Sequence, residues 1–167
     1  IAEPKPGDPH AVYLEWDLAL RRVLVTVLAE AIGITVEPPA PLGMSSAIPS
    51  TIAMLQDAVQ QFAPADDMQR MQQDAADRVA EYVTRDHAYG AEADRAARAE
   101  AAEILGEDHG DWATIDAALE RFVQRAGPEE DARLLRFFHR QAERNVLVYG
   151  PSRIGHAAQA VFLPPLR

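Results

Sequence analysis

Four arginines recur at intervals of three and four residues near the C-terminal end of the chain, at Arg133, Arg136, Arg140 and Arg144. On a helix that turns about 100° per residue, this spacing places all four on one side. The opposite side is apolar and consists of Leu134, Leu135, Phe138, Ala142, Val146 and Tyr149. Guanidinium groups bind carboxylates and phosphates through paired hydrogen bonds, so this arginine row indicates a surface for an acidic protein partner or a small anion.

Internal ion pairing explains the same row without any ligand. Residues 66–111 contain thirteen acidic residues and five arginines, whereas residues 133–153 contain five arginines and one glutamate. Ion pairs between these two regions, within one chain or across a dimer, would neutralise both. The sequence therefore leaves three alternatives open: docking of an acidic partner, binding of a small anion, and internal pairing.

Two further groups contain residue types that bind metal ions. His139 precedes Glu143 by one turn of the same predicted helix, and imidazole and carboxylate one turn apart suit a metal ion or acid–base catalysis. His109 and Asp108 lie in the segment GEDHGDW, whose carboxylates and imidazole could hold a divalent cation. The structural alternative is a boundary histidine paired with Glu143 and an ordinary interhelical turn. Because neither group supplies a complete ligand set, the sequence assigns no metal ion and no cofactor.

Recognisable catalytic motifs are missing from the sequence. It contains no G-x-x-x-x-G-K-[ST] phosphate-binding loop, no G-x-S-x-G nucleophile elbow and no H-E-x-x-H metal motif. The chain also has no cysteine, which excludes disulfides, thiolate metal ligands and cysteine nucleophiles. These absences favour a non-catalytic protein over an enzyme, without deciding the question.

Composition limits the class of protein and its partners. With 167 residues, of which 48% are hydrophobic and 25% charged, the chain is long enough for a single globular domain over residues 1–167. Its net charge of −10 argues against nucleic acid as a partner. No apolar run is long enough to cross a membrane, and no signal peptide is recognisable. We therefore expect a cytoplasmic protein with no membrane association.

Hydrophobic spacing predicts an all-α bundle of about six helices. Residues 1–9 are a proline-rich, extended lead-in. They precede a predicted helix at residues 10–32. Because this helix is apolar around most of its circumference, it is predicted to be the central helix. Residues 34–49 contain four prolines and form a connecting loop. Further helices are predicted at residues 50–62, 66–90, 91–105, 112–126, 128–149 and 152–162.

Local signals set several of these helix ends. Asp66 and Asp67 open one helix, Gly106 ends another, and Asp111 caps the next. The apolar side of the helix at residues 50–62 is predicted to be its buried side, consisting of Ile52, Leu55, Val59 and Phe62. Met68, Met71, Ala75, Val79 and Tyr82 follow at spacings of three and four residues along the helix at 66–90.

Over about residues 49–153 the chain contains, in this order, the segments PSTIAMLQDAVQQF, DAADRVAEYVTRD, ADRAARAEAAEILGEDHGDWATIDAALERFVQRAG and LLRFFHRQAERNVLVYGPSR. The order of features in these segments resembles a family of small, uncharacterised, all-helical bacterial proteins that are encoded beside aminoglycoside-phosphotransferase-like kinases. The helix at residues 10–32 and the proline-rich loop have no counterpart in that family. The resemblance implies an accessory role and no catalytic residues.

The sequence thus predicts a soluble helical protein that acts as a non-catalytic protein-binding or accessory module through its arginine row. A homo-oligomer, most simply a dimer, is expected, with a protein partner and no cofactor. The alternative is an enzyme or a small-ligand or metal-binding bundle, in which His139, Glu143, His109 and Asp108 would line an interior pocket.

Overall fold

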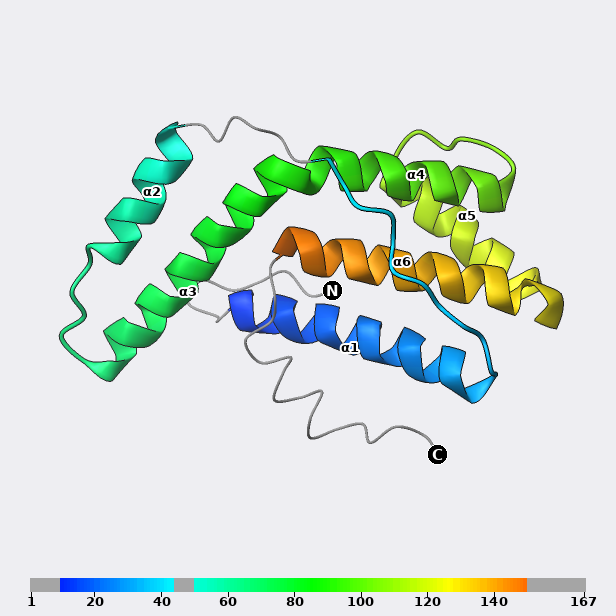
Figure 1. Cartoon of the computed structure of the whole chain (residues 1–167), viewed down its shortest axis with the longest axis horizontal. Coiled ribbons are helices and arrows are strands. Elements are labelled where there is room, and N and C mark those ends of the chain that lie inside the picture. Colours follow the sequence, from blue (N-terminus) through cyan, green and yellow to red (C-terminus); the bar gives the residue numbers. More distant parts are fainter. Residues whose placement is uncertain (1–9, 44–49, 150–167) are drawn as a thin grey trace.

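The computed structural model describes residues 10–43 and 50–149, with side chains for residues 17–43 and 51–149. The described elements are α1 (His10–Ala31), α2 (Ser50–Gln60), α3 (Asp67–Arg85), the π-helix η1 (Asp86–Gly90), α4 (Ala91–Leu105), α5 (Trp112–Arg125), the 3-10 helix η2 (Pro128–Glu130) and α6 (Asp131–Tyr149) (Figure 1). No strand occurs in this part of the chain, which confirms the all-α prediction. The predicted lead-in at 1–9, the loop end at 44–49 and the helix at 152–162 lie outside it.

The central helix is α6, and the prediction that the helix at residues 10–32 is central is wrong. α6 lies between α1 and α4, with contacts to both (Figure 1). The core cluster joins three helices through Ala101 and Ile104 of α4, Ile115 and Leu119 of α5, and Leu134 and Phe137 of α6. α1 covers one side of α6, and among the side chains described for α1, over residues 17–31, Leu18 and Ala29 are the buried apolar ones. Because α1 is apolar around most of its circumference, its sequence could not reveal that α6 and α3 leave part of its apolar surface exposed.

Helix boundaries follow the predicted capping residues. The Asp66 side chain accepts a hydrogen bond from Gln69 N at 2.8 Å, and the Asp111 side chain accepts one from Thr114 N at 2.9 Å. Gly106 adopts a left-handed φ of 79° where α4 ends, a conformation that glycine tolerates without strain. These three ends are fixed by short-range chemistry, which explains why sequence reasoning located them.

The segment between α3 and α4 remains helical instead of breaking near Gly90. Both Asp86 and Gly90 have right-handed helical backbone angles, and the five residues from Asp86 to Gly90 form a π-helical turn. Because α3, η1 and α4 follow one another without a loop, they form one long, bent rod (Figure 1). α2 packs against the N-terminal part of this rod. We call the hairpin formed by α2 and α3 the arm.

Candidate functional site

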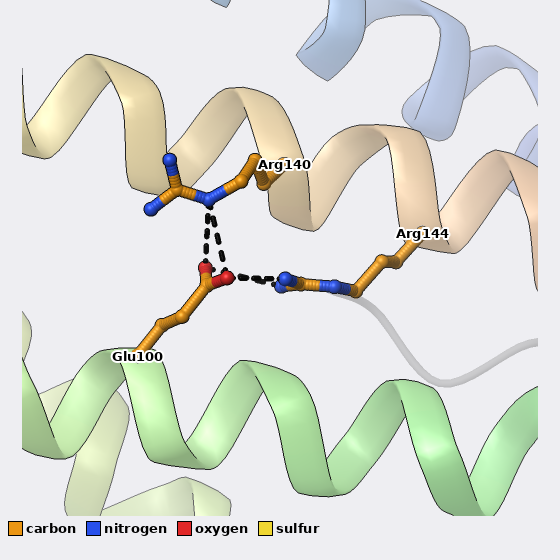
Figure 2. A network of polar contacts seen from close by, with 3 residues as sticks. All are labelled: Glu100, Arg140 and Arg144. Atoms are coloured by element: carbon orange, nitrogen blue, oxygen red, sulfur yellow. Dashed lines mark hydrogen bonds and ion pairs between the residues drawn. The ribbon is translucent and has the colours of Figure 1, made fainter. Parts of the chain in front are cut away.

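Two of the four arginines in the row bind a single carboxylate on the neighbouring helix. Arg140 Nε lies 3.1 Å from both carboxylate oxygens of Glu100, which belongs to α4. Arg144 Nη1 lies 3.2 Å from Glu100 Oε2, and its Nη2 donates to Glu100 Oε1. Figure 2 shows Glu100 between the two guanidinium groups, which reach it from successive turns of α6. This three-residue cluster connects α4 to α6.

Burial removes Arg144 from any docking surface. Arg144 is 4% exposed, and a guanidinium ion that leaves water is tolerated only when it is paired and hydrogen-bonded. Glu100 supplies that pairing, although Arg144 Nε has no hydrogen-bond partner. Phe137, on the same stretch of α6, is fully buried against the core. The side of α6 that the sequence indicated as a charged surface is therefore partly a helix-packing surface.

The other two arginines remain near the surface, where they contact the chain itself. Arg133 lies 3.5 Å from Glu130 Oε2 and donates to the backbone carbonyl of Glu103. Arg136 Nε donates to the carbonyl of Thr35 at 3.4 Å, in the segment that follows α1. The arginine row is thus divided: Arg140 and Arg144 bind α4, whereas Arg133 and Arg136 are exposed.

His139 and Glu143 lie together at the contact between α1 and α6. His139 Nε2 is 3.9 Å from Glu143 Oε1, and the same oxygen accepts a hydrogen bond from Arg22 Nε of α1. His139 is 9% exposed, and its Nδ1 has no hydrogen-bond partner. Because Arg22 compensates the charge of Glu143, this carboxylate connects α1 to α6 as Glu100 connects α4 to α6.

His109 and Asp108 lie elsewhere, in the turn between α4 and α5. His109 Nε2 is 3.3 Å from Glu107 Oε1, and Asp108 Oδ1 accepts a hydrogen bond from Gly110 N at 2.9 Å. The turn is thus stabilised by its own hydrogen bonds, and these residues are not brought together with His139. Among the described residues, no group of three or more His, Cys, Asp or Glu side chains could hold a metal ion.

A cavity of about 190 Å³ lies beside the glutamate–arginine cluster, with η1 and α6 in its walls. Asp94 in its lining accepts hydrogen bonds from Trp112 Nε1 and, at 2.8 Å, from Arg98 Nε. Burial raises the pKa of Asp94, but these two hydrogen bonds lower it by more, so the carboxylate stays ionised at neutral pH. The lining includes Arg144 of the arginine row, but it contains none of His139, Glu143, His109 and Asp108.

Several large apolar residues of the arm are exposed to solvent. Met68, Met71 and Val79 of α3 are 62%, 64% and 51% exposed. We call these three residues the methionine row. Leu55 of α2 and Phe62, which follows the end of α2, are 45% and 52% exposed, so the prediction that they lie on a buried side is wrong. The regular spacing of these apolar residues placed them on one side of their helix. It could not show whether another element would cover that side.

The polar side of α3 makes the contact with α2. Gln73 Nε2 donates hydrogen bonds to the carbonyl oxygens of Val59 at 3.2 Å and Phe62 at 2.7 Å. These bonds hold the C-terminal end of α2 against the side of α3 that carries Gln73. The methionine row, on another side of α3, consequently stays in solvent.

None of the described helices is both long enough and apolar enough to cross a membrane. Comparison of the chain with protein-family models, with curated proteins and with solved structures yields no match.

Proposed function

We propose that this protein is a non-catalytic protein-binding module whose docking surface is the methionine row of the arm. The observation that carries the proposal is the exposure of Met68, Met71 and Val79, each more than half open to solvent on one side of one helix. Large apolar side chains exposed along one side of a helix are typical of an interaction site. Methionine adapts its shape to different partners because its side chain is unbranched and flexible.

The methionine row extends a buried side of the same helix. Tyr82, one turn beyond Val79, stacks on Tyr149 of α6 with ring centroids 4.6 Å apart. Arg85 Nε also donates to the carbonyl of Leu147 in α6, at 2.7 Å. The C-terminal part of α3 is thus covered by α6, while the methionine row extends past this contact. A partner helix lying on the row would continue the packing that α6 begins.

Charge on the arm indicates what kind of partner fits. Residues 50–85 contain six acidic residues and three arginines, and Asp66, Asp67 and Asp74 are exposed on the same helix end as the methionine row. A partner with an apolar stripe and basic flanks would complement both features. We therefore propose a cationic amphipathic helix as the partner, in place of the acidic partner that the arginine row indicated. The accessory role implied by the family resemblance is in keeping with this proposal.

A synthetic amphipathic helix of leucine and lysine tests the proposal by isothermal titration calorimetry on the full chain. The double variant Met68→Gln/Met71→Gln should weaken binding by about tenfold or more, because two apolar contacts are lost. Val123→Gln is the matched control: Val123 is an exposed apolar residue of α5, and its change should leave the affinity within about twofold.

A second peptide, in which glutamate replaces every lysine, separates apolar contact from charge. Under the proposal this acidic peptide binds much more weakly than the basic one. Equal affinity of the wild type and the double variant for the basic peptide would refute the methionine row as the docking surface.

A further inference from the structure

The outer side of α1 carries a second row of exposed apolar residues, separate from the methionine row. Leu20, Leu24, Leu28 and Ile32 recur every four residues and are 58%, 58%, 44% and 51% exposed. We call these four residues the leucine row. On the inner side, Leu18 and Ala29 are 8% and 1% exposed against the rest of the bundle. α1 is therefore apolar on both sides, but covered on one.

A helix that is apolar all round is normally buried all round. In the described part of the chain, α1 packs against α6 and α3 through its inner side, which leaves the leucine row without cover. Side chains spaced by four residues form a ridge along a helix, and such a ridge packs into the groove beside the same ridge on a second helix. We propose that the leucine row is the interface through which two copies of this chain form a two-fold symmetric dimer.

The charge on this side of α1 favours a second copy as the occupant. The charged side chains beside Leu20 and Leu24 are Asp17 and Arg21, and Arg21 Nε lies 2.9 Å from Asp17 Oδ2. Their charges cancel within one chain, so two such surfaces can approach without net repulsion. Elsewhere the protein carries its net charge of −10, which opposes self-association through other parts of the surface. The leucine row is thus apolar, locally neutral and able to pair with itself.

The arrangement of the two helices follows from the even spacing of the row. In an antiparallel pair with its two-fold axis between Leu24 and Leu28, each Leu24 faces Leu28 of the second copy. The ends then match, because Leu20 faces Ile32 of the second copy. From Leu20 to Ile32 the row covers thirteen residues, or about 18 Å of helix. This contact is smaller than a standard interface of about 800 Å² per partner, so we expect dissociation in the micromolar range.

Sedimentation equilibrium of the full chain over a concentration series measures this dimer directly. The wild type should approach twice the chain mass of 18.3 kDa at about 100 µM and dissociate on dilution. Leu24→Glu/Leu28→Glu should stay monomeric throughout the series, because it places four carboxylates in an apolar contact. Both leucines are exposed in the single chain, so the far-ultraviolet circular dichroism of the variant should match the wild type.

The variants of the arm are the matched control, and they keep this inference independent of the proposed function. Met68→Gln/Met71→Gln should dimerise like the wild type, even if it no longer binds the basic peptide. A wild type that is monomeric at about 100 µM would overturn the inference, and would leave another protein as the occupant. Dimers that survive Leu24→Glu/Leu28→Glu, or that are lost only in the arm variant, would overturn it equally.

Cysteine cross-linking provides a second measurement of the interface. The chain has no cysteine of its own, so every disulfide formed reports on an introduced residue. Mixed Leu24→Cys and Leu28→Cys chains should oxidise to a cross-linked dimer faster than Val123→Cys chains, because those leucines face each other across the proposed axis. Equal rates for the two samples would contradict the antiparallel pairing.

Discussion

Among single residues, two carboxylates connect α6 to the helices on either side of it. Glu100 of α4 binds Arg140 and Arg144, and Glu143 of α6 binds Arg22 of α1. Periodicity in the sequence correctly placed four arginines on one side of a helix. It could not identify Glu100 as the partner, because Glu100 lies forty residues before Arg140 in the chain. Tertiary packing thus converted half of a predicted charged surface into an internal contact.

Glu100→Gln should destabilise the fold markedly, because Arg144 would stay buried without a counter-charge. We expect the free energy of unfolding, measured by urea denaturation, to fall by about 2–3 kcal/mol. This loss is smaller than the cost of breaking a fully buried ion pair, because Glu100 is partly exposed. Glu103→Gln is the matched control, one turn along α4 and exposed, and should change stability by less than about 0.5 kcal/mol. Equal effects of the two changes would show that the cluster contributes nothing specific.

At the scale of elements, local chemistry determined where helices end, and long-range packing determined which sides they bury. Asp66, Gly106 and Asp111 were recognisable because their capping partners lie within four residues. The sequence could not show which side of α1 is buried, because α1 is apolar around most of its circumference. The number of helices that pack against it also depends on tertiary packing, which no sequence pattern states. The arm illustrates the same limit: Met68, Met71 and Val79 have the spacing of a core side, but α2 packs elsewhere on α3.

The cap of α5 predicts a pH dependence of stability. Hydrogen bonds from the backbone and side chain of Thr114 lower the pKa of Asp111 below the ordinary value of an aspartate. Because the folded-state pKa lies below the unfolded one, this contribution is complete above the unfolded pKa and is lost as the pH falls through the folded pKa. Asp111→Ala should therefore be less stable than the wild type at pH 7, with a difference that shrinks as the pH falls below about 4.

Asp111→Asn is the control for this prediction, since asparagine also caps helices but does not ionise. Its stability relative to Asp111→Ala should not change over the same pH range, as measured by thermal unfolding in a series of buffers. If the difference between the wild type and Asp111→Ala were constant down to pH 2, ionisation of the cap would not contribute.

The described part of the molecule as a whole consists of a core and two outer apolar rows. α4, α5 and α6 share the core cluster, while α1 and the arm each leave large hydrophobic side chains in solvent. Exposed rows of this kind gain stabilisation of about 25 cal/mol per Å² of apolar surface when a partner covers them. We propose different occupants for the two: a cationic helix for the methionine row, and a second copy of the chain for the leucine row.

Hydrogen–deuterium exchange of the full chain, with and without the leucine–lysine peptide, locates the surface to which the peptide binds. Binding to the methionine row should slow amide exchange in residues 67–79, because a covered helix opens less often. Exchange in residues 133–144, which carry the arginine row, should be unchanged by the peptide. Slowed exchange at 133–144, or unchanged exchange at 67–79 when the peptide is bound, would contradict the account and place the docking surface elsewhere.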